Sequence, residues 1–161
     1  MTRHTSPAIR QSTIPPPETE ATMNDTPSKM TFNVNAQRVD AHGSEARCKS
    51  ATLTLDTDLA GRLDAFNPAE LLMAALAACM IKGIERVTPI LKFELRGVEV
   101  RLHGIRQNVP PRMEAIDYEI LVDTDESDQR LERLHDNVRK FGTVYNTVAP
   151  GTRLRGELKR A

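Results

Sequence analysis

An unbroken apolar run at residues 71–81 is the clearest element in the chain. Asn67 is placed to cap a helix, Pro68 suits its first position, and Glu70 completes a capping box. Because the run has no polar face, we expect a helix that is buried on all sides and ends at Pro89. The run is also too short to cross a membrane, which requires roughly 20 apolar residues.

Strand-like alternation of apolar and polar positions flanks this helix on both sides. Residues 31–57 alternate loosely and predict short antiparallel strands. After the helix, two longer runs at 92–105 and 112–122 are separated by a proline pair, so we expect them to form a hairpin. A last short strand is predicted at 153–159. The residues of the second long run that share one face are Ile116, Tyr118, Ile120 and Val122.

A second helix is predicted between the hairpin and the last strand, with Asp125 or Ser127 as its cap. The order of strands, helix, two strands, helix and strand is typical of an α+β fold built on antiparallel sheets. The apolar residues at helical spacing in this second helix are Leu131, Leu134, Val138 and Phe141.

Residues 1–30 differ from the rest of the chain, since half of its ten prolines lie there. Such a segment buries too little apolar surface to offset its ordering entropy. We therefore expect a disordered Pro- and Thr-rich tail over 1–30 and one folded domain over 31–161.

Charge and composition exclude several classes of protein. Lys plus Arg and Asp plus Glu both number 22, so the chain lacks the basic excess that nucleic-acid or membrane-surface binding requires. Two cysteines form no disulfide framework, the four histidines have no metal-ligand spacing, and no secretory signal is visible. We expect a cytoplasmic protein with no metal, cofactor, nucleic-acid or membrane partner, and solvated His103 and His135.

Cys79 is the first candidate for chemistry, although a free cysteine in a helix is more often a small buried apolar residue. It lies too far from the helix N-terminus for the helix dipole to activate it, so a reactive thiolate needs a cation from elsewhere. Cys48 and Arg47 are neighbours in a predicted strand and therefore point to opposite faces. Cys48 is interpreted as a surface or half-buried thiol.

The segment from Asn67 to Cys79 resembles the central-helix motif of the OsmC/Ohr family, named for osmotically inducible protein C and organic hydroperoxide resistance proteins. The segment 141–147 resembles that family's second motif, in which a His-Cys-Pro sequence stands where this chain has Phe141, Gly142 and Thr143. The resemblance spans about residue 30 to the C-terminus. It implies an OsmC-like fold in which sheets pack around two central helices in an intertwined homodimer.

Family members reduce organic hydroperoxides with a reactive cysteine that matches Cys79, and an early-strand arginine matching Arg47 stabilises its thiolate. Their activating glutamate falls on Ala69, and their second cysteine falls on Gly142. The chain is thus a divergent member on this resemblance. Without the second cysteine, the sulfenic acid formed at Cys79 must be reduced by an external thiol.

Two functions remain open from the sequence. The first is a thiol peroxidase of oxidative stress defence that uses Cys79 and Arg47. The second is a non-catalytic dimer that binds an apolar small molecule in an interface pocket, which we expect to be lined by Leu72, Met73, Leu76 and Met80.

Overall fold

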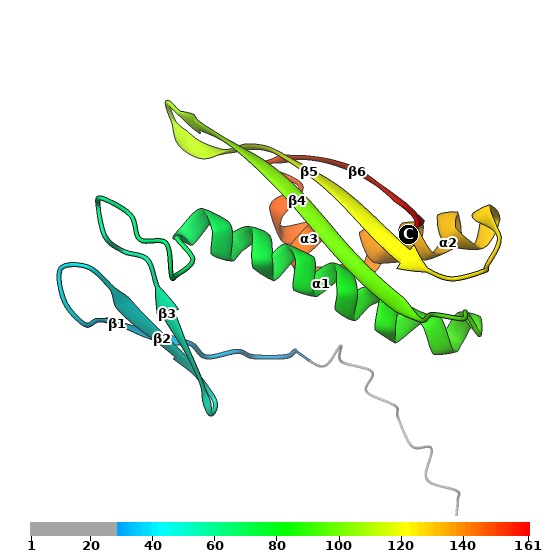
Figure 1. Cartoon of the computed structure of the whole chain (residues 1–161), viewed down its shortest axis with the longest axis horizontal. Coiled ribbons are helices and arrows are strands. Elements are labelled where there is room, and N and C mark those ends of the chain that lie inside the picture. Colours follow the sequence, from blue (N-terminus) through cyan, green and yellow to red (C-terminus); the bar gives the residue numbers. More distant parts are fainter. Residues whose placement is uncertain (1–28) are drawn as a thin grey trace, which may run out of the picture. The chain divides into compact units, whose positions relative to one another are not determined.

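The computed structural model describes residues 29–161, which are drawn in colour in Figure 1. Residues from Asn33 to the C-terminus form one compact unit that contains every element described below. The predicted tail at 1–30 lies almost entirely outside the described residues. Its boundary with the folded domain therefore stays a prediction.

The first sheet contains three short antiparallel strands in sequence order: β1 (Asn35–Arg38), β2 (Ser44–Cys48) and β3 (Ala51–Leu55). Most of its side chains are exposed, and Leu53 retains 39% of its accessible surface. The backbone N–H of Asp56 donates to the Phe66 carbonyl at 3.0 Å, which ties the end of β3 to the loop before the long helix.

The long helix α1 (Pro68–Leu91) begins as the sequence predicts. The Asn67 Oδ1 accepts from the backbone N–H groups of Ala69 and Glu70 at 2.9 and 3.0 Å, and Glu70 Oε2 accepts from the Asn67 N–H at 2.9 Å. This reciprocal pair satisfies N–H groups that a helix start otherwise leaves without partners.

The expectation that Pro89 ends this helix is wrong, because α1 continues to Leu91. A proline lacks the N–H that would bond the carbonyl of Glu85. The Thr88 hydroxyl donates to that carbonyl at 3.2 Å instead. Lys92 then closes the helix in the left-handed conformation, at a φ of 49°.

The expectation that α1 is buried on all sides is also wrong for this chain. Leu76, Met80 and Ile84 are buried, whereas Ala75 and Ala78 on the opposite face are exposed and Leu72 is 36% exposed. The fold covers one side of the helix only, so an apolar face is left open to solvent.

The second sheet has the order β4 (Gly97–Asn108), β5 (Pro111–Asp123) and β6 (Arg153–Arg160). The predicted hairpin is confirmed by antiparallel pairing of β4 with β5. Since β6 lies parallel to β5, this sheet is mixed rather than wholly antiparallel. β4 begins five residues later than expected, after α1 has ended and the chain has turned.

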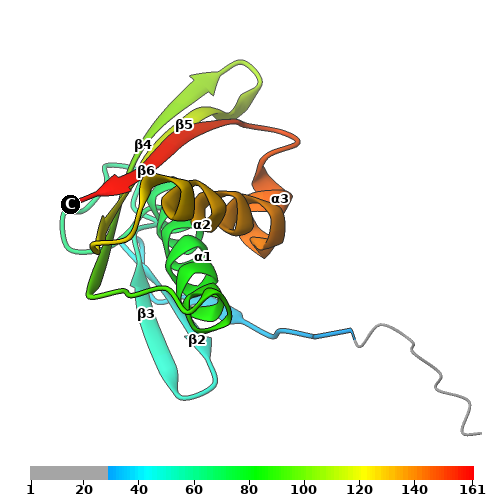
Figure 2. The same cartoon turned by 90° about the vertical axis from the view of Figure 1, so that its right-hand side faces the viewer.

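The core lies between the second sheet and two helices, α1 and α2 (Asp128–Phe141). Both helices cover the same face of the sheet (Figures 1 and 2). Phe141, which shares the helical spacing of the apolar residues of α2, is 50% exposed. The buried residues that β5 and α2 contribute, as the periodicity predicts, are Ile116, Tyr118, Ile120, Val122, Leu131, Leu134 and Val138.

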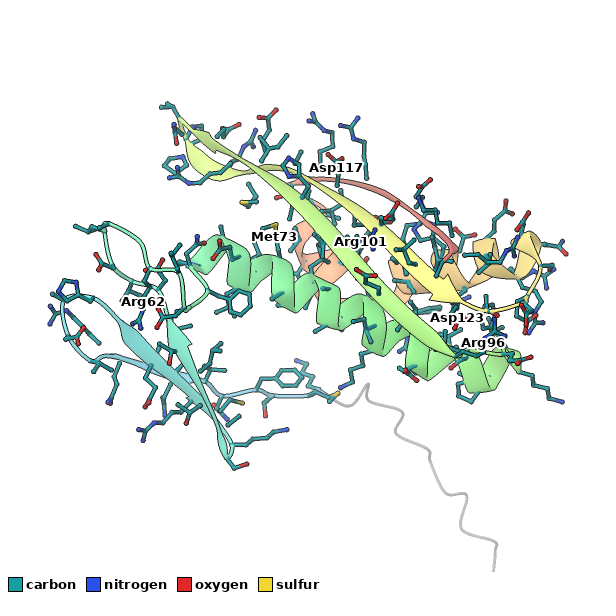
Figure 3. The ribbon with its side chains drawn as sticks, viewed as in Figure 1. Arg62, Met73, Arg96, Arg101, Asp117 and Asp123 are labelled. Carbon is teal, nitrogen blue, oxygen red and sulfur yellow. The ribbon has the colours of Figure 1, made fainter. Side chains whose placement is uncertain are left out.

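A third helix, α3 (Thr143–Val148), was not predicted. Its six residues are too few to show a helical repeat of apolar positions. The outer side of the second sheet carries ion pairs, such as that of Arg96 with Asp123 at 2.8 Å (Figure 3). The architecture confirms the α+β class.

Candidate functional site

The structure brings the two motif segments together, although they lie about sixty residues apart in the chain. α2 runs back along α1, so that its end at Gly142 meets Cys79. A methyl group placed on Gly142 would lie 3.5 Å from the Cys79 Sγ. The half-buried Cys79 therefore lies beside the position that the second family cysteine would occupy.

Gly142 is buried in a space that has no room for a larger residue. A β-carbon there would come within 2.8 Å of the Val138 carbonyl oxygen and 3.0 Å of the Tyr145 Cβ. The first of these contacts is with backbone, which cannot rotate away. The junction of α2 and α3 is therefore packed too closely for any residue but glycine. A cysteine could be placed there only with a shift of the backbone.

Arg47 and Cys48 lie on the central strand of the first sheet. Arg47 is exposed and its Nε donates to Glu45 Oε1 at 2.5 Å, whereas Cys48 is half-buried. This difference agrees with the expectation that the two side chains point to opposite faces of the strand. Within residues 29–161, no hydrogen bond or ion pair joins Arg47 to Cys79. The role of Arg47 at Cys79 therefore stays a prediction.

The four residues of α1 that we expect to line an apolar pocket at the dimer interface differ in their exposure within the single chain. Leu76 and Met80 are sealed in the core at 0% and 1% exposure, because their one-turn spacing places both against the second sheet. Leu72 lies on the open face of α1. Met73 lines a cavity.

That cavity, of about 620 Å³, lies at the start of α1. Arg62 and Met73, both labelled in Figure 3, line it from the preceding loop and from the helix. Its apolar surface comes from Met73 and from Leu63, Phe66, Ala74 and Leu102.

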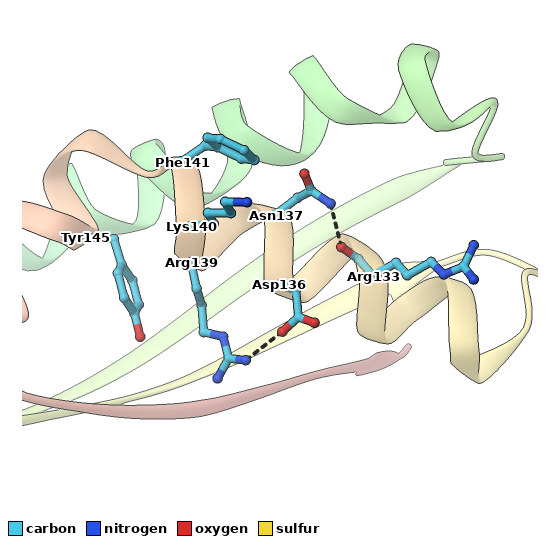
Figure 4. Close-up of a pocket in the computed structure, with 7 residues that line it drawn as sticks. All are labelled: Arg133, Asp136, Asn137, Arg139, Lys140, Phe141 and Tyr145. Carbon is cyan, nitrogen blue, oxygen red and sulfur yellow. Dashed lines mark hydrogen bonds and ion pairs between the residues drawn. The ribbon is translucent and has the colours of Figure 1, made fainter.

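A larger open groove of about 870 Å³ runs along α2 to α3. Figure 4 shows the side chains that line it, with Phe141 and Arg139 pointing to opposite sides of α2. Three cations and one carboxylate lie along the groove, so its charge is positive. The residues that form it include Arg133, Asp136, Arg139, Lys140, Phe141 and Tyr145.

Tyr145, which lines this groove, lies close to Gly142 on the same side as Cys79, since a β-carbon on Gly142 would be 3.0 Å from the Tyr145 Cβ and 3.5 Å from the Cys79 Sγ. The Arg86 guanidinium of α1 lies 5.6 Å and the Lys140 ammonium 5.2 Å from the centre of the Phe141 ring. Both distances fall within the range of a cation–π contact. The apolar positions of 128–141 do not reveal this groove; the adjacent basic residues Arg139 and Lys140, with Arg133 two turns before them, were the signal for it in the sequence.

His135 is not solvated as expected, because its ring lies half-buried against Tyr118 of β5. The Tyr118 hydroxyl and the His135 Nε2 share a hydrogen bond of 2.8 Å. Burial, and then the charge of Arg139, lower the pKa of His135. Burial also raises the pKa of Tyr118. The pair is therefore neutral near pH 7.

Two other features of the described residues concern cofactors and membranes. Between residues 29 and 161, no cluster of three or more His, Cys, Asp or Glu side chains is arranged to hold a metal ion. In the same range, no helix combines the length and hydropathy needed to span a bilayer.

Solved structures share this fold at low sequence identity. An OsmC-like protein from Mycoplasma pneumoniae has a TM-score of 0.76 and 16% identity, over 83% of this chain and 99% of that chain. An organic hydroperoxide resistance protein OsmC from Legionella pneumophila has a TM-score of 0.67 and 18% identity, over 82% and 98% of the two chains. The organic hydroperoxide resistance protein OhrB of Bacillus subtilis has a TM-score of 0.59 and 18% identity, over 81% and 98%.

No curated protein matches the chain by sequence. The family described as OsmC-like protein, however, matches residues 60–156, which is more than half of the chain. That range contains α1, both motif segments and the contact of Cys79 with Gly142. Together with the shared fold, this match shows that the chain belongs to the OsmC-like protein family.

Proposed function

We propose that this protein reduces organic hydroperoxides in stress defence, with Cys79 as the attacking thiol and an external thiol as the reductant. The observation that carries the proposal is the contact between Cys79 and Gly142, since it joins the two motif segments at one site. Two solved structures of the same fold are named organic hydroperoxide resistance proteins, which supports this substrate class.

The reaction begins when the Cys79 thiolate attacks one peroxide oxygen. The O–O bond breaks, Cys79 becomes a sulfenic acid, and the departing alkoxide takes up the proton that the thiol released and leaves as an alcohol. A cation near the sulfur favours the thiolate that this step requires. Arg47 serves this role in the proposal, and it must leave Glu45 to do so.

The sulfenic acid is then reduced from outside the chain. Gly142 has no sulfur and its surroundings leave no space for one. Cys48 lies on β2, and it forms no disulfide with Cys79. An external thiol is therefore required for turnover, and without it the sulfur is exposed to further, irreversible oxidation.

The proposed site lies beside the open face of α1, where we also place the homodimer contact. The exposed apolar surface of Leu72, Ala75 and Ala78 is the support for this assembly. A second subunit would cover that face and shield the sulfur from bulk water.

The test is to trap the sulfenic acid with dimedone after one equivalent of cumene hydroperoxide. We expect a single adduct on Cys79 by mass spectrometry in the wild type and in a Cys48→Ala control. Cys79→Ala should form no adduct and lose peroxide consumption. Unchanged peroxide consumption by Cys79→Ala would refute the proposal.

The cavity of about 620 Å³ at the start of α1 favours a second function, the binding of an apolar small molecule without catalysis. The pH dependence of Cys79 alkylation separates the two functions. A thiol that reacts well below the ordinary thiol pKa of about 8.5 supports the peroxidase. A thiol that stays inert up to that pH supports the binding protein.

A further inference from the structure

The groove along α2 has two cations that no carboxylate neutralises. Arg139 pairs with Asp136 at 2.6 Å. In the described part of the chain, by contrast, no carboxylate oxygen lies within ion-pair distance of Arg133 or Lys140. Arg139, the third basic residue that lines the groove, is paired, so an anion in this groove would meet two charges that are free to bind it.

The position of these charges relative to Cys79 limits the size of such an anion. Arg133 lies nine residues and Lys140 two residues before Gly142, which follows the end of α2 beside Cys79. A helix rises 1.5 Å per residue, which places the two charges about 14 Å and about 3 Å from Gly142 along the axis. An extended peptide of three residues spans about 10 Å, which lies between these two distances.

The volume of the groove and its aromatic residues suit a ligand of this kind. A volume of about 870 Å³ is within the range of small-ligand sites, which extends to about 1,000 Å³. Phe141 and Tyr145 offer apolar surface along the groove, and Tyr145 does so beside Gly142, near the reacting sulfur. A ligand can therefore place a thiol at Cys79 and a carboxylate among the cations.

We propose that the groove binds the external reductant, and that this reductant is a carboxylate-bearing thiol about the length of a tripeptide. The inference rests on the proposed function, because it names the thiol that replaces the missing second cysteine. Arg133 and Lys140 are binding residues in this scheme, and they take no part in the attack on the peroxide.

The chemistry balances with two molecules of thiol. The sulfur of the first attacks the Cys79 sulfenic acid, an S–S bond forms, and water leaves. The second thiol attacks the first thiol's sulfur, that S–S bond breaks, and Cys79 leaves as a thiolate. Overall, one hydroperoxide is reduced to alcohol and water while two thiols are oxidised to one disulfide.

Binding is measured first, without any redox step. S-methylglutathione has the charges of an acidic tripeptide thiol but cannot be oxidised to a disulfide, so calorimetry on the wild-type protein reports the groove alone. We expect Arg133→Gln/Lys140→Gln to bind it about tenfold more weakly, because two exposed charge contacts are lost. The control Arg106→Gln/Arg112→Gln removes the same charge from the β4–β5 hairpin and should bind as the wild type does.

Recycling is measured second, by stopped-flow reduction of the Cys79 sulfenic acid. Glutathione should react faster than its ethyl ester, which has the same thiol and less negative charge, and faster than the cationic thiol cysteamine. The advantage should shrink in the Arg133→Gln/Lys140→Gln variant and at high salt, where exposed charges are screened.

The outcomes separate the two proposals. Two results would overturn the inference and leave the proposed function standing, provided that the sulfenic acid is trapped. One is that the three thiols reduce it at equal rates, and the other is that both double variants bind S-methylglutathione with equal affinity. Failure to form any sulfenic acid at Cys79 overturns both, whatever the groove binds. Charge-dependent binding together with charge-dependent recycling supports both.

Discussion

The two sheets of this protein differ in how much they bury. In the second sheet, Ile116, Ile120 and Val122 of β5 are completely buried beneath α1 and α2. In the first sheet, every residue of β1 is exposed, and the apolar Leu53 of β3 retains 39% of its surface. One sheet has a closed core, and the other has no core of its own.

This difference indicates what the fold still lacks. A three-stranded sheet requires a packed apolar face for stability in water. The first sheet has none within the described chain, and the open face of α1 is also apolar. Both features are explained by a second copy of the chain that covers them, which agrees with the homodimer we propose.

The largest effect should come from truncating the closed sheet. Ile120→Ala removes a fully buried side chain, and we expect it to lower the free energy of unfolding by about 2–5 kcal/mol. Leu53→Ala removes a side chain of the same size from the open sheet and should cost far less at concentrations where the protein is monomeric. Urea denaturation measures both, and equal losses would contradict the contrast between the sheets.

The next effect concerns the open face of α1. Leu72→Asp should lower the free energy of unfolding of the monomer by less than Ile120→Ala does, since 36% of the Leu72 surface is already exposed. It should weaken the proposed dimer at least about tenfold, because it places a charge in an apolar interface. Sedimentation velocity measures the association. The control Val109→Asp, at the β4–β5 turn, should dimerise as the wild type does. If Leu72→Asp dimerised as strongly as the wild type, the interface would have to lie elsewhere.

The smallest effect is a pH dependence that has opposite signs in the two regions. In the loop between β1 and β2, a hydrogen bond to Asp58 raises the pKa of the exposed His42. Its contribution to stability is therefore present below the unfolded pKa of about 6.5 and is lost as pH rises through the folded value. Under the closed sheet, burial lowers the pKa of His135. The imidazole is therefore protonated at a higher pH in the unfolded chain than in the folded one, and stability falls as pH drops below about 6.5.

Urea midpoints between pH 5 and 8 distinguish these contributions. His135→Gln should flatten the loss of stability on the acid side, where Asp136, Arg139 and Tyr118 are the neighbouring groups. His42→Gln should change the slope in the opposite direction. If both variants changed it in the same direction, one of the two assignments would be incorrect.

The sequence was most informative where a local pattern and a local physical requirement coincide. The start of α1 follows from Asn67, Pro68 and Glu70, because a cap is satisfied by residues within one turn. The inward face of β5 follows from its alternation, because side chains in a strand alternate between faces. The end of α1 was less predictable, since the Thr88 hydroxyl compensates for Pro89.

The candidate site was only partly predictable. Cys79 and the replacement of the second cysteine by Gly142 came from the resemblance to a family. The basic groove came from the structure, since its residues on α2 are joined there by Tyr145 of α3, a helix that no sequence pattern predicted. The burial of His135 likewise depends on β5, which no local pattern in α2 reveals.

By itself, the sequence determined the class of the fold, the helix that carries Cys79 and the loss of a second sulfur, because periodicity, capping and residue identity are local properties. Tertiary structure alone decided that Gly142 is packed too tightly for a side chain, that one face of α1 stays open, and that the groove of the two free cations extends to Tyr145 beside Gly142. Those features depend on which surfaces meet when α2 folds back onto α1, and burial and charge at such contacts arise from residues distant in the chain.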